Sequence, residues 1–298
     1  MMTASLDDIR SRLAAGSVLA RDDAEALWAS RDIIGLGMLA DEARRSRHGD
    51  RTTFVRVAEV PLEAAETATW PESAGEVRLV GRPADADAAV TAVRLVVRRA
   101  GGIPVTAYSL PDLDAVAGSR DGLHALVARL VDAGLAAITE ARLDLVADCR
   151  GSVEGVLKGG GQISRFTVHR AALPSPVAIM AEARALQKAT GAMRTFAPLP
   201  QEIDQARPTT GYDDARTIAL ARLLADNVPS IQVDWALYGA KLAQVALLFG
   251  ADDLDAVPAS DEAPDGHRRS PLEEVRRNVR AAALVPVERD GRFAIRHA

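Results

Sequence analysis

Short strand-forming runs alternate with amphipathic helical segments along most of this chain, and this alternation restricts its fold more than any other feature. The strand-like runs are residues 52–57, 76–81, 103–110, 136–139, 164–171, 194–199 and 231–237, and helical periodicity is clearest in 84–100, 121–134, 174–190, 211–227 and 239–249. Such alternation is typical of parallel β/α units. Seven or eight units in roughly 250 residues favour an α/β fold of the TIM-type (β/α) barrel over an open doubly wound sheet, with "LDAV" (254–257) as the last strand.

The two ends of the chain depart from this pattern. Residues 6–48 are helical in periodicity, and "PLEEVRRNVRAAALVPV" (271–287) predicts a helix followed by a strand-like tail. We therefore expect an N-terminal helical extension over residues 1–50, packed on a barrel domain over residues 51–298.

Composition excludes several classes of protein. The formal net charge of −5 gives no sign of the basic surface that nucleic-acid binding needs. No run of 18 apolar residues predicts a membrane span, and the acidic, amphipathic N-terminus lacks the apolar core of a signal peptide. We expect a cytoplasmic protein. One cysteine, Cys149, rules out an intramolecular disulfide and a metal site of the usual cysteine-ligated type.

An acidic cluster follows the apolar run "KLAQVALLFG" (241–250). Asp252, Asp253 and Asp255 fall within four positions, and they could form a metal site, a substrate-binding rim or a solvated turn. In a parallel barrel the first two would lie at the structural end, where they would cap or pair with arginine, and Asp255 would point inward. Composition does not decide among these readings, and no histidine pair with metal-ligand spacing accompanies them.

Three stretches carry a family resemblance. They are "ALWASRDIIGLGMLADEARRSRHGDRTTFV" (26–55), "GYDDARTIALARLLADNVPSIQVDWALYGAKLAQVALLFGADDLDAV" (211–257) and "VRAAALVPVERDGRF" (279–293). Together they resemble the radical S-adenosylmethionine enzymes of the futalosine route to menaquinone, aminofutalosine synthase and cyclic dehypoxanthine futalosine synthase, and the related deazaflavin synthase subunits. The resemblance is collinear from about residue 20 to the C-terminus and implies a barrel.

The resemblance also implies a [4Fe–4S] cluster held by a Cys-x3-Cys-x2-Cys loop after the first strand. Here that strand runs into "AEVPLEAAETATWPESAGEVRLVG" (58–81), which contains no cysteine. Because thiolates hold such clusters, we expect no iron–sulfur cluster, no other metal and no cofactor. The same divergence weakens the expectation of S-adenosylmethionine binding.

Other family positions have also changed. The family's Gly-Gly pair is replaced by "VGRP", with Arg82 in place of one glycine, and only Glu140 remains acidic near the fourth strand end. Where the family has a Gly-His-x-Glu-Thr-like strand end, this chain reads "VHRAAL" (168–173), in which His169 would be the displaced or surviving histidine and the glutamate is absent. In the "GADDLDA" stretch, which the resemblance makes a scaffold and rim element, Ala256 replaces the terminal glycine and removes its freedom for positive φ.

Three functions remain open. The first is a cluster-free pseudoenzyme or accessory protein that binds an active radical S-adenosylmethionine paralogue, forms a homo-oligomer or holds a pathway intermediate. The second is a repurposed non-radical enzyme, with His169 and Glu140 as catalytic residues. The third is a binder of a nucleoside or aromatic carboxylate. The candidate substrate-binding residues are Arg82, Tyr108, Arg170, Tyr238 and Asp255. Trp70 and Trp235 could stack on a ring, although a strand position also suits Trp235 to the core.

Overall fold

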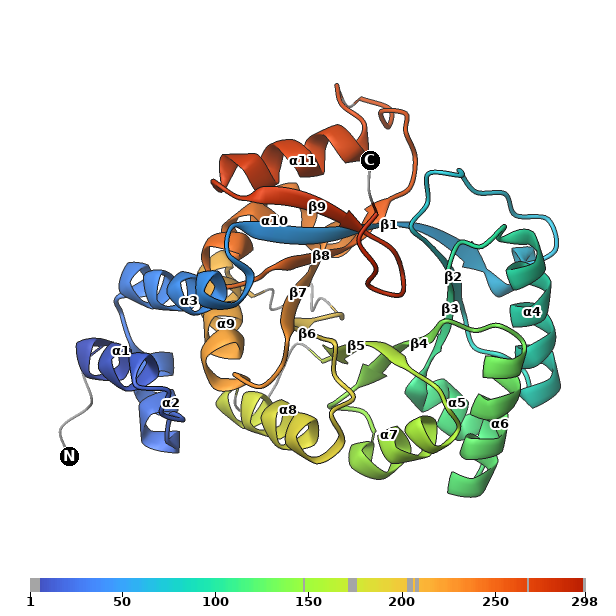
Figure 1. Cartoon of the computed structure of the whole chain (residues 1–298), viewed down its shortest axis with the longest axis horizontal. Coiled ribbons are helices and arrows are strands. Elements are labelled where there is room, and N and C mark those ends of the chain that lie inside the picture. The colour runs from blue at the N-terminus through green and yellow to red at the C-terminus, as the bar shows by residue number, and fades with distance from the viewer. Residues whose placement is uncertain are drawn as a thin grey trace.

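Eight parallel strands close into a barrel in the computed structural model, which describes residues 6–146, 148–170, 176–202, 206, 209–266 and 268–296 (Figure 1). The strands are β1 (Arg51–Pro61), β2 (Glu76–Val80), β3 (Val105–Ser109), β4 (Ala137–Arg142), β5 (Ile163–Val168), β6 (Thr195–Pro200), β7 (Ser230–Asp234) and β8 (Asp253–Pro258). Each pairs with the next in chain order, and β1 pairs with both β2 and β8. The predicted TIM-type (β/α) barrel is therefore confirmed.

Helices surround the barrel, and two of them were not predicted. They are α4 (Ala86–Arg99), α5 (Leu110–Ala117), α6 (Arg120–Asp132), α7 (Cys149–Lys158), α8 (Pro176–Thr190), α9 (Gly211–Leu224), α10 (Trp235–Leu248) and α11 (Pro271–Ala281), with a short 3-10 turn η1 (Leu62–Ala64) after β1. The unpredicted pair is α5 and α7. The predicted strand 231–237 is too long, because the Asp234 carboxylate accepts a hydrogen bond from the backbone N–H of Leu237 and so starts α10. Trp235 begins that helix and is buried in the core.

The first strand has two partners along one edge. Its second half pairs with β2, whereas its first half pairs in parallel with β9 (Val285–Arg289), the predicted strand-like tail. Gly75 lies where these partners diverge. A Cβ there would come within 2.9 Å of the Arg289 carbonyl oxygen, so the junction requires glycine.

The barrel interior is polar. Glu76 and Arg78 of β2, Arg165 of β5, and Asp253 and Asp255 of β8 are at most 8% exposed. Side chains alternate across a strand, so their neighbours Val77, Leu79, Phe166 and Leu254 face the helices and form the apolar core there. Branched aliphatic residues dominate the interior of a typical barrel of this class. Here ion pairs fill it.

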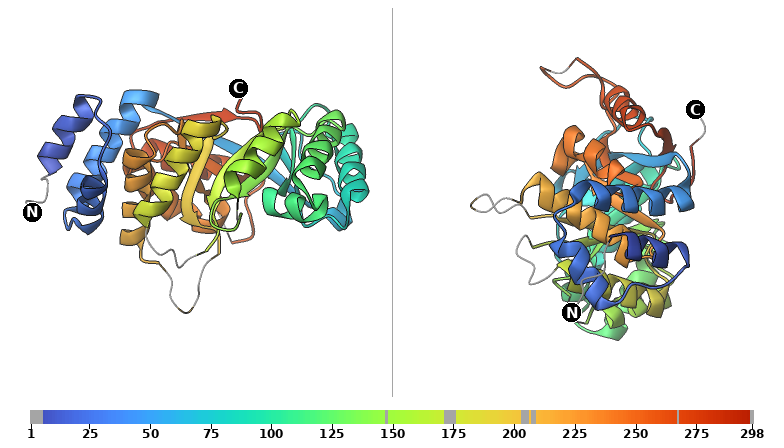
Figure 2. Two further views of the ribbon diagram at one scale, coloured as in Figure 1. Left: turned by 90° about the horizontal axis from the view of Figure 1, so that it is seen from below. Right: turned by 90° about the vertical axis from the view of Figure 1, so that its left-hand side faces the viewer.

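Helices α1 (Leu6–Ala14), α2 (Arg21–Ala29) and α3 (Ile33–His48) lie beside α8 and α9 (Figures 1 and 2). The division into an extension over residues 1–50 and a barrel over residues 51–298 stays a prediction. Among the described helices, none combines the length and the apolar character that crossing a bilayer requires.

Candidate binding site at the barrel mouth

A cavity of about 240 Å³ opens at the carboxyl ends of β2, β3 and β4. This is the end of a (β/α) barrel at which sites are built. The lining residues are Glu59, Arg78, Leu79, Val80, Gly81, Arg82, Tyr108, Ser109, Asp112, Thr139, Glu140, Arg142 and Arg165. Four arginines and three carboxylates face this space, so it suits a charged or strongly polar ligand.

The floor is built on a buried carboxylate between two guanidinium groups. Asp255 Oδ1 lies 2.9 Å from Arg78 Nη2, and Asp255 Oδ2 also accepts a hydrogen bond from Arg165 Nη1. Burial alone would raise the pKa of Asp255, but Arg78 and Arg165 outweigh it and hold that pKa well below the ordinary value. Asp255 is therefore ionised, and the arginines keep their orientation.

A second carboxylate stands at the wall. Glu140 Oε1 accepts a hydrogen bond from Arg142 Nε at 2.6 Å, and Glu140 Oε2 accepts one from the Thr167 hydroxyl at 3.3 Å. Burial acts to raise the pKa of Glu140, but Arg165 and Arg142 lower it below the ordinary value. A carboxylate held ionised in this way serves to position the arginines and is not a ready proton donor near neutral pH.

Two buried polar atoms of the cavity residues have no hydrogen-bond partner in the part of the chain that the structure describes. They are Arg165 Nε and the Thr139 hydroxyl oxygen, on side chains whose residues are 8% and 7% exposed. Leaving a buried donor unpaired costs about 1–3 kcal/mol. An oxygen acceptor is the partner that the Arg165 Nε–H lacks, and the Thr139 hydroxyl can also donate to one.

Two of the predicted binding residues line this cavity in addition to Glu140. Arg82 follows β2, with its Nε 4.0 Å from Asp112 Oδ1 and its side chain 65% exposed, so it is free to move toward a ligand. Tyr108 is the last residue but one of β3 and has a left-handed conformation, with φ of 62°, and its hydroxyl donates to the Ala89 carbonyl oxygen at 2.9 Å. Burial raises the pKa of that hydroxyl, which stays protonated. Asp255 lies beneath the cavity.

The other predicted residues lie outside the cavity. The backbone N–H groups of His169 and Arg170 donate to the Asp144 carboxylate at 2.8 and 2.7 Å, and His169 Nε2 lies 3.8 Å from Glu202 Oε2. The Tyr238 hydroxyl donates to the Pro200 carbonyl oxygen at 2.5 Å. The structure does not bring His169 and Glu140 together in one cavity. Trp70 packs against the Arg99 guanidinium, also away from the site.

The acidic cluster after α10 is buried and paired with arginine, so it is not a solvated turn. Asp252 accepts hydrogen bonds from Arg222 and from the Ser230 hydroxyl. Asp253 accepts a bidentate pair from Arg289, with both distances 2.7 Å. Among the described residues, no group of three or more potential ligands is placed to hold a metal ion.

The sequence analysis missed Arg78, Thr139, Arg142 and Arg165. A signal for two of them is present: Arg78 and Arg165 are charged residues inside the predicted strands 76–81 and 164–171. A charge in a strand covered by helices must find a buried partner, and the only space for one is the barrel interior. Thr139 carries no such signal, because threonine is common in strands.

Comparison with known proteins finds similarity to two kinds of enzyme, a synthase and a transferase. Residues 195–298 match the family described as the CofH/MqnC C-terminal region. The aminodeoxyfutalosine synthase of Streptomyces coelicolor is 26% identical, with 97% of this chain and 93% of that protein covered. The same enzyme of Thermus thermophilus is 25% identical, with 96% and 94% covered. The 5-amino-6-(D-ribitylamino)uracil–L-tyrosine 4-hydroxyphenyl transferase of Archaeoglobus fulgidus is 32% identical over 43% of this chain and 45% of its own length.

Solved structures show the same fold. Methylornithine synthase has a TM-score of 0.67 at 14% identity, with 93% of this chain and 97% of that chain covered. The FeFe-hydrogenase maturase HydG from Carboxydothermus hydrogenoformans has a TM-score of 0.64 at 12% identity, with 95% and 79% covered. At these identities the likeness concerns the barrel alone.

The comparisons contradict the prediction that this chain takes no cofactor. The relatives that cover nearly the whole chain are aminodeoxyfutalosine synthases, radical S-adenosylmethionine enzymes that use an iron–sulfur cluster and S-adenosylmethionine. The single cysteine, Cys149, begins α7 and is buried, and burial raises the pKa of its thiol to about 12. This chain's own residues thus do not supply three thiolates. That is a fact about cluster ligands and does not show that the cluster is lost.

The agreement over nearly the whole length of two synthases, the C-terminal family match and the shared barrel confirm the resemblance that the sequence predicted. The chain is therefore similar over nearly its whole length to two aminodeoxyfutalosine synthases, and its C-terminal third matches the CofH/MqnC C-terminal region.

Proposed function

We propose that this chain is an accessory protein of the menaquinone pathway that holds a small carboxylate at the barrel mouth. The observation that carries the proposal is the pair of unpartnered atoms, Arg165 Nε and the Thr139 hydroxyl, on residues that line the cavity. Arginine is the residue best suited to a carboxylate, because its planar fork matches both oxygens.

The size of the cavity narrows the ligand. Its volume of about 240 Å³ is smaller than the ~300–1,000 Å³ of sites for drug-sized molecules. A benzoate-sized acid fits this space, and the rest of a larger ligand would project past Arg82 toward solvent. An aromatic carboxylate therefore suits the site better than a nucleoside.

The geometry gives less support to a repurposed enzyme that uses His169. Its ring nitrogen lies near Glu202, and neither His169 nor Arg170 lines the cavity. A complex with an active paralogue and a homo-oligomer both stay predictions.

A titration followed by thermal unfolding tests the proposal. The probes are benzoate, 3-(1-carboxyvinyloxy)benzoate and S-adenosylmethionine, with benzamide as the neutral control. A ligand at a hundred times its Kd adds about 2.7 kcal/mol to the free energy of unfolding. We expect the two benzoates to raise the Tm and benzamide to leave it unchanged. No shift with either acid would contradict the proposal.

A matched pair of variants locates the binding. Thr139→Val removes the unpartnered hydroxyl in the cavity, and Thr52→Val removes another buried, unpartnered hydroxyl on β1 that does not line it. Both variants should be as stable as the parent or slightly more so, since neither loses a hydrogen bond. Only Thr139→Val should weaken benzoate binding, by about tenfold, as expected for a hydrogen bond to a charged group. Equal affinities in the two variants would place the acid elsewhere.

A further inference from the structure

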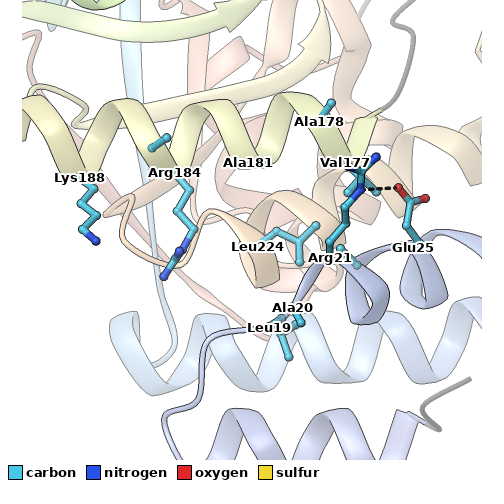
Figure 3. A pocket seen from close by; sticks show the side chains of 12 residues that line it. Leu19, Ala20, Arg21, Glu25, Val177, Ala178, Ala181, Arg184, Lys188 and Leu224 are labelled. Carbon is cyan, nitrogen blue, oxygen red and sulfur yellow. Dashed lines mark ion pairs between the residues drawn. The ribbon is translucent and has the colours of Figure 1, made fainter.

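A second cavity lies away from the barrel mouth, between α2 and α8. Its volume is about 490 Å³, and it shares no lining residue with the mouth cavity. Figure 3 shows α8 along one side, α2 on the other and Leu224 of α9 between them. The position links the N-terminal helices to the barrel.

Small and apolar side chains form the walls. The lining alanines are Ala178, Ala181 and Ala185 of α8 with Ala20 and Ala24 at the start of α2. Because these side chains are short, they leave the cavity between the two helices open. The floor contains Val177 and Leu224, which are 5% and 9% exposed. The groove would therefore hold an apolar body.

Positive charge gathers on the rim. Three cations line the groove and Glu25 is the one acidic lining residue. Arg21 Nε lies 3.9 Å from Glu25 Oε1, and Arg184 pairs with Asp226 at 2.6 Å. Lys188, in the last turn of α8, forms no ion pair with any described residue. Arg184 and Lys188 project from α8 to the same side of the groove (Figure 3).

We propose that this groove binds a small amphipathic anion, with its apolar body against the alanines and its anionic group beside Lys188. The volume lies within the ~300–1,000 Å³ typical of small-molecule sites, and such sites are mostly apolar with a few placed polar groups. The uncompensated lysine at one end selects an anion over a neutral chain. This site is independent of the carboxylate site at the barrel mouth.

The test uses sodium decanoate below its micellar concentration, with decanol as the neutral control, measured by calorimetric titration of the full chain. Lys188→Gln should weaken decanoate binding about two- to fivefold, the range for an exposed charge pair, and should not change decanol binding. The matched control is Lys158→Gln, because Lys158 occupies the last turn of the neighbouring helix α7 and lines neither cavity. Lys158→Gln should bind decanoate as the parent does.

Two further variants act on the groove itself. Ala181→Trp fills it and should abolish binding, and Ala185→Glu adds a negative charge that should repel the anion, with Ala185→Gln as the neutral variant of the same size. Both positions are exposed, so the fold should tolerate the changes, and thermal unfolding checks this. Thr139→Val, at the barrel mouth, should not change decanoate affinity. Unchanged binding in Ala181→Trp, no binding in the parent, or equal loss in Lys188→Gln and Lys158→Gln would overturn the proposal.

Discussion

The two ends of the barrel interior use the same chemistry with different results. At the amino end, Asp253 is saturated: Arg289 binds it twice, and the Gln232 amide and the Thr53 hydroxyl each donate to it. At the carboxyl end, Asp255 is also bound by two arginines, yet Arg165 keeps an unpartnered Nε beside an open cavity.

This difference separates the ion pairs that stabilise the fold from those that lie next to the cavity. Both oxygens of Asp253 are bonded, none of these hydrogen-bond partners lines the cavity, and the Phe293 ring of the tail after β9 lies 4.0 Å from the Arg289 guanidinium carbon. At the other end the unpartnered Arg165 Nε belongs to a residue that lines a cavity. We therefore expect the Asp253 ion pair to stabilise the fold and the Asp255 ion pairs to support the proposed site.

The largest expected effect comes from removing one buried charge at each end. Asp253→Asn removes the ion-pair partner of the buried Arg289, and breaking a buried pair in this way costs about 3–5 kcal/mol. Asp255→Asn weakens two buried arginines at once, because among the described residues Arg78 keeps only Glu76 and Arg165 keeps only Asp234 and Glu140. We expect both to lower the midpoint of urea unfolding by similar amounts. Benzoate affinity should change only in Asp255→Asn, because only Asp255 orients arginines that line the cavity. If Asp253→Asn altered the affinity equally, the division between the two ends would be wrong.

The second-largest expected effect is a loss of stability at low pH, which should arise at the carboxyl end of the barrel. The pKa values of Asp255 and Glu140 are lowered on folding, because the attraction of the arginines exceeds the cost of burial. Their stabilisation is therefore complete above the unfolded-state pKa of about 4 and is lost as the pH falls through the folded-state values. Urea unfolding from pH 7 to pH 3 should show stability declining below about pH 4. Asp255→Asn should flatten that decline, and an unchanged slope would exclude Asp255 as its source.

The junction at which β2 and β9 diverge from β1 depends on Gly75. Gly75→Ala places a Cβ 2.9 Å from the Arg289 carbonyl oxygen and should destabilise the fold by about 1–3 kcal/mol, as overpacking does. Gly211→Ala is the control, since nothing lies within 4 Å of its added Cβ. Thermal unfolding should separate the two variants, and benzoate affinity per folded molecule should be unchanged in both. Equal Tm values would show that the junction can relax.

Much of the barrel follows from the sequence because its signals are local. Each strand of the barrel overlaps a strand-like run that the sequence predicted, and the arginine partners of Asp252 and Asp253 follow from placing those residues at the structural end. The helices α5 and α7 were missed: α7 carries two glycines, Gly151 and Gly155, so its propensity signal is weak. The site depends on which strand interiors face one another, so Arg165 and Thr139 become partners of one cavity only when the barrel closes.

The smallest expected change in stability concerns Ala256, and it tests how far the barrel mouth differs from that of the relatives. The resemblance places glycine there, and alanine was expected to remove positive φ, yet Ala256 adopts φ of 54° beside the irregular pairing of β1 and β8. Position 256 thus adopts a left-handed conformation with alanine, which costs about 1–2 kcal/mol of strain for a residue with a Cβ. Ala256→Gly should relieve that strain, while glycine gives back about 0.4–1 kcal/mol of unfolded-state entropy. The net gain should be about 0.5–1 kcal/mol.

Ala283→Gly is the matched control, because Ala283 has φ of 56° in an exposed turn after α11. Equal gains in urea unfolding would mean that position 256 carries backbone strain alone. A gain at Ala283 with none at Ala256 would mean that the Ala256 methyl group, which is 7% exposed, packs well enough at the mouth to offset the strain.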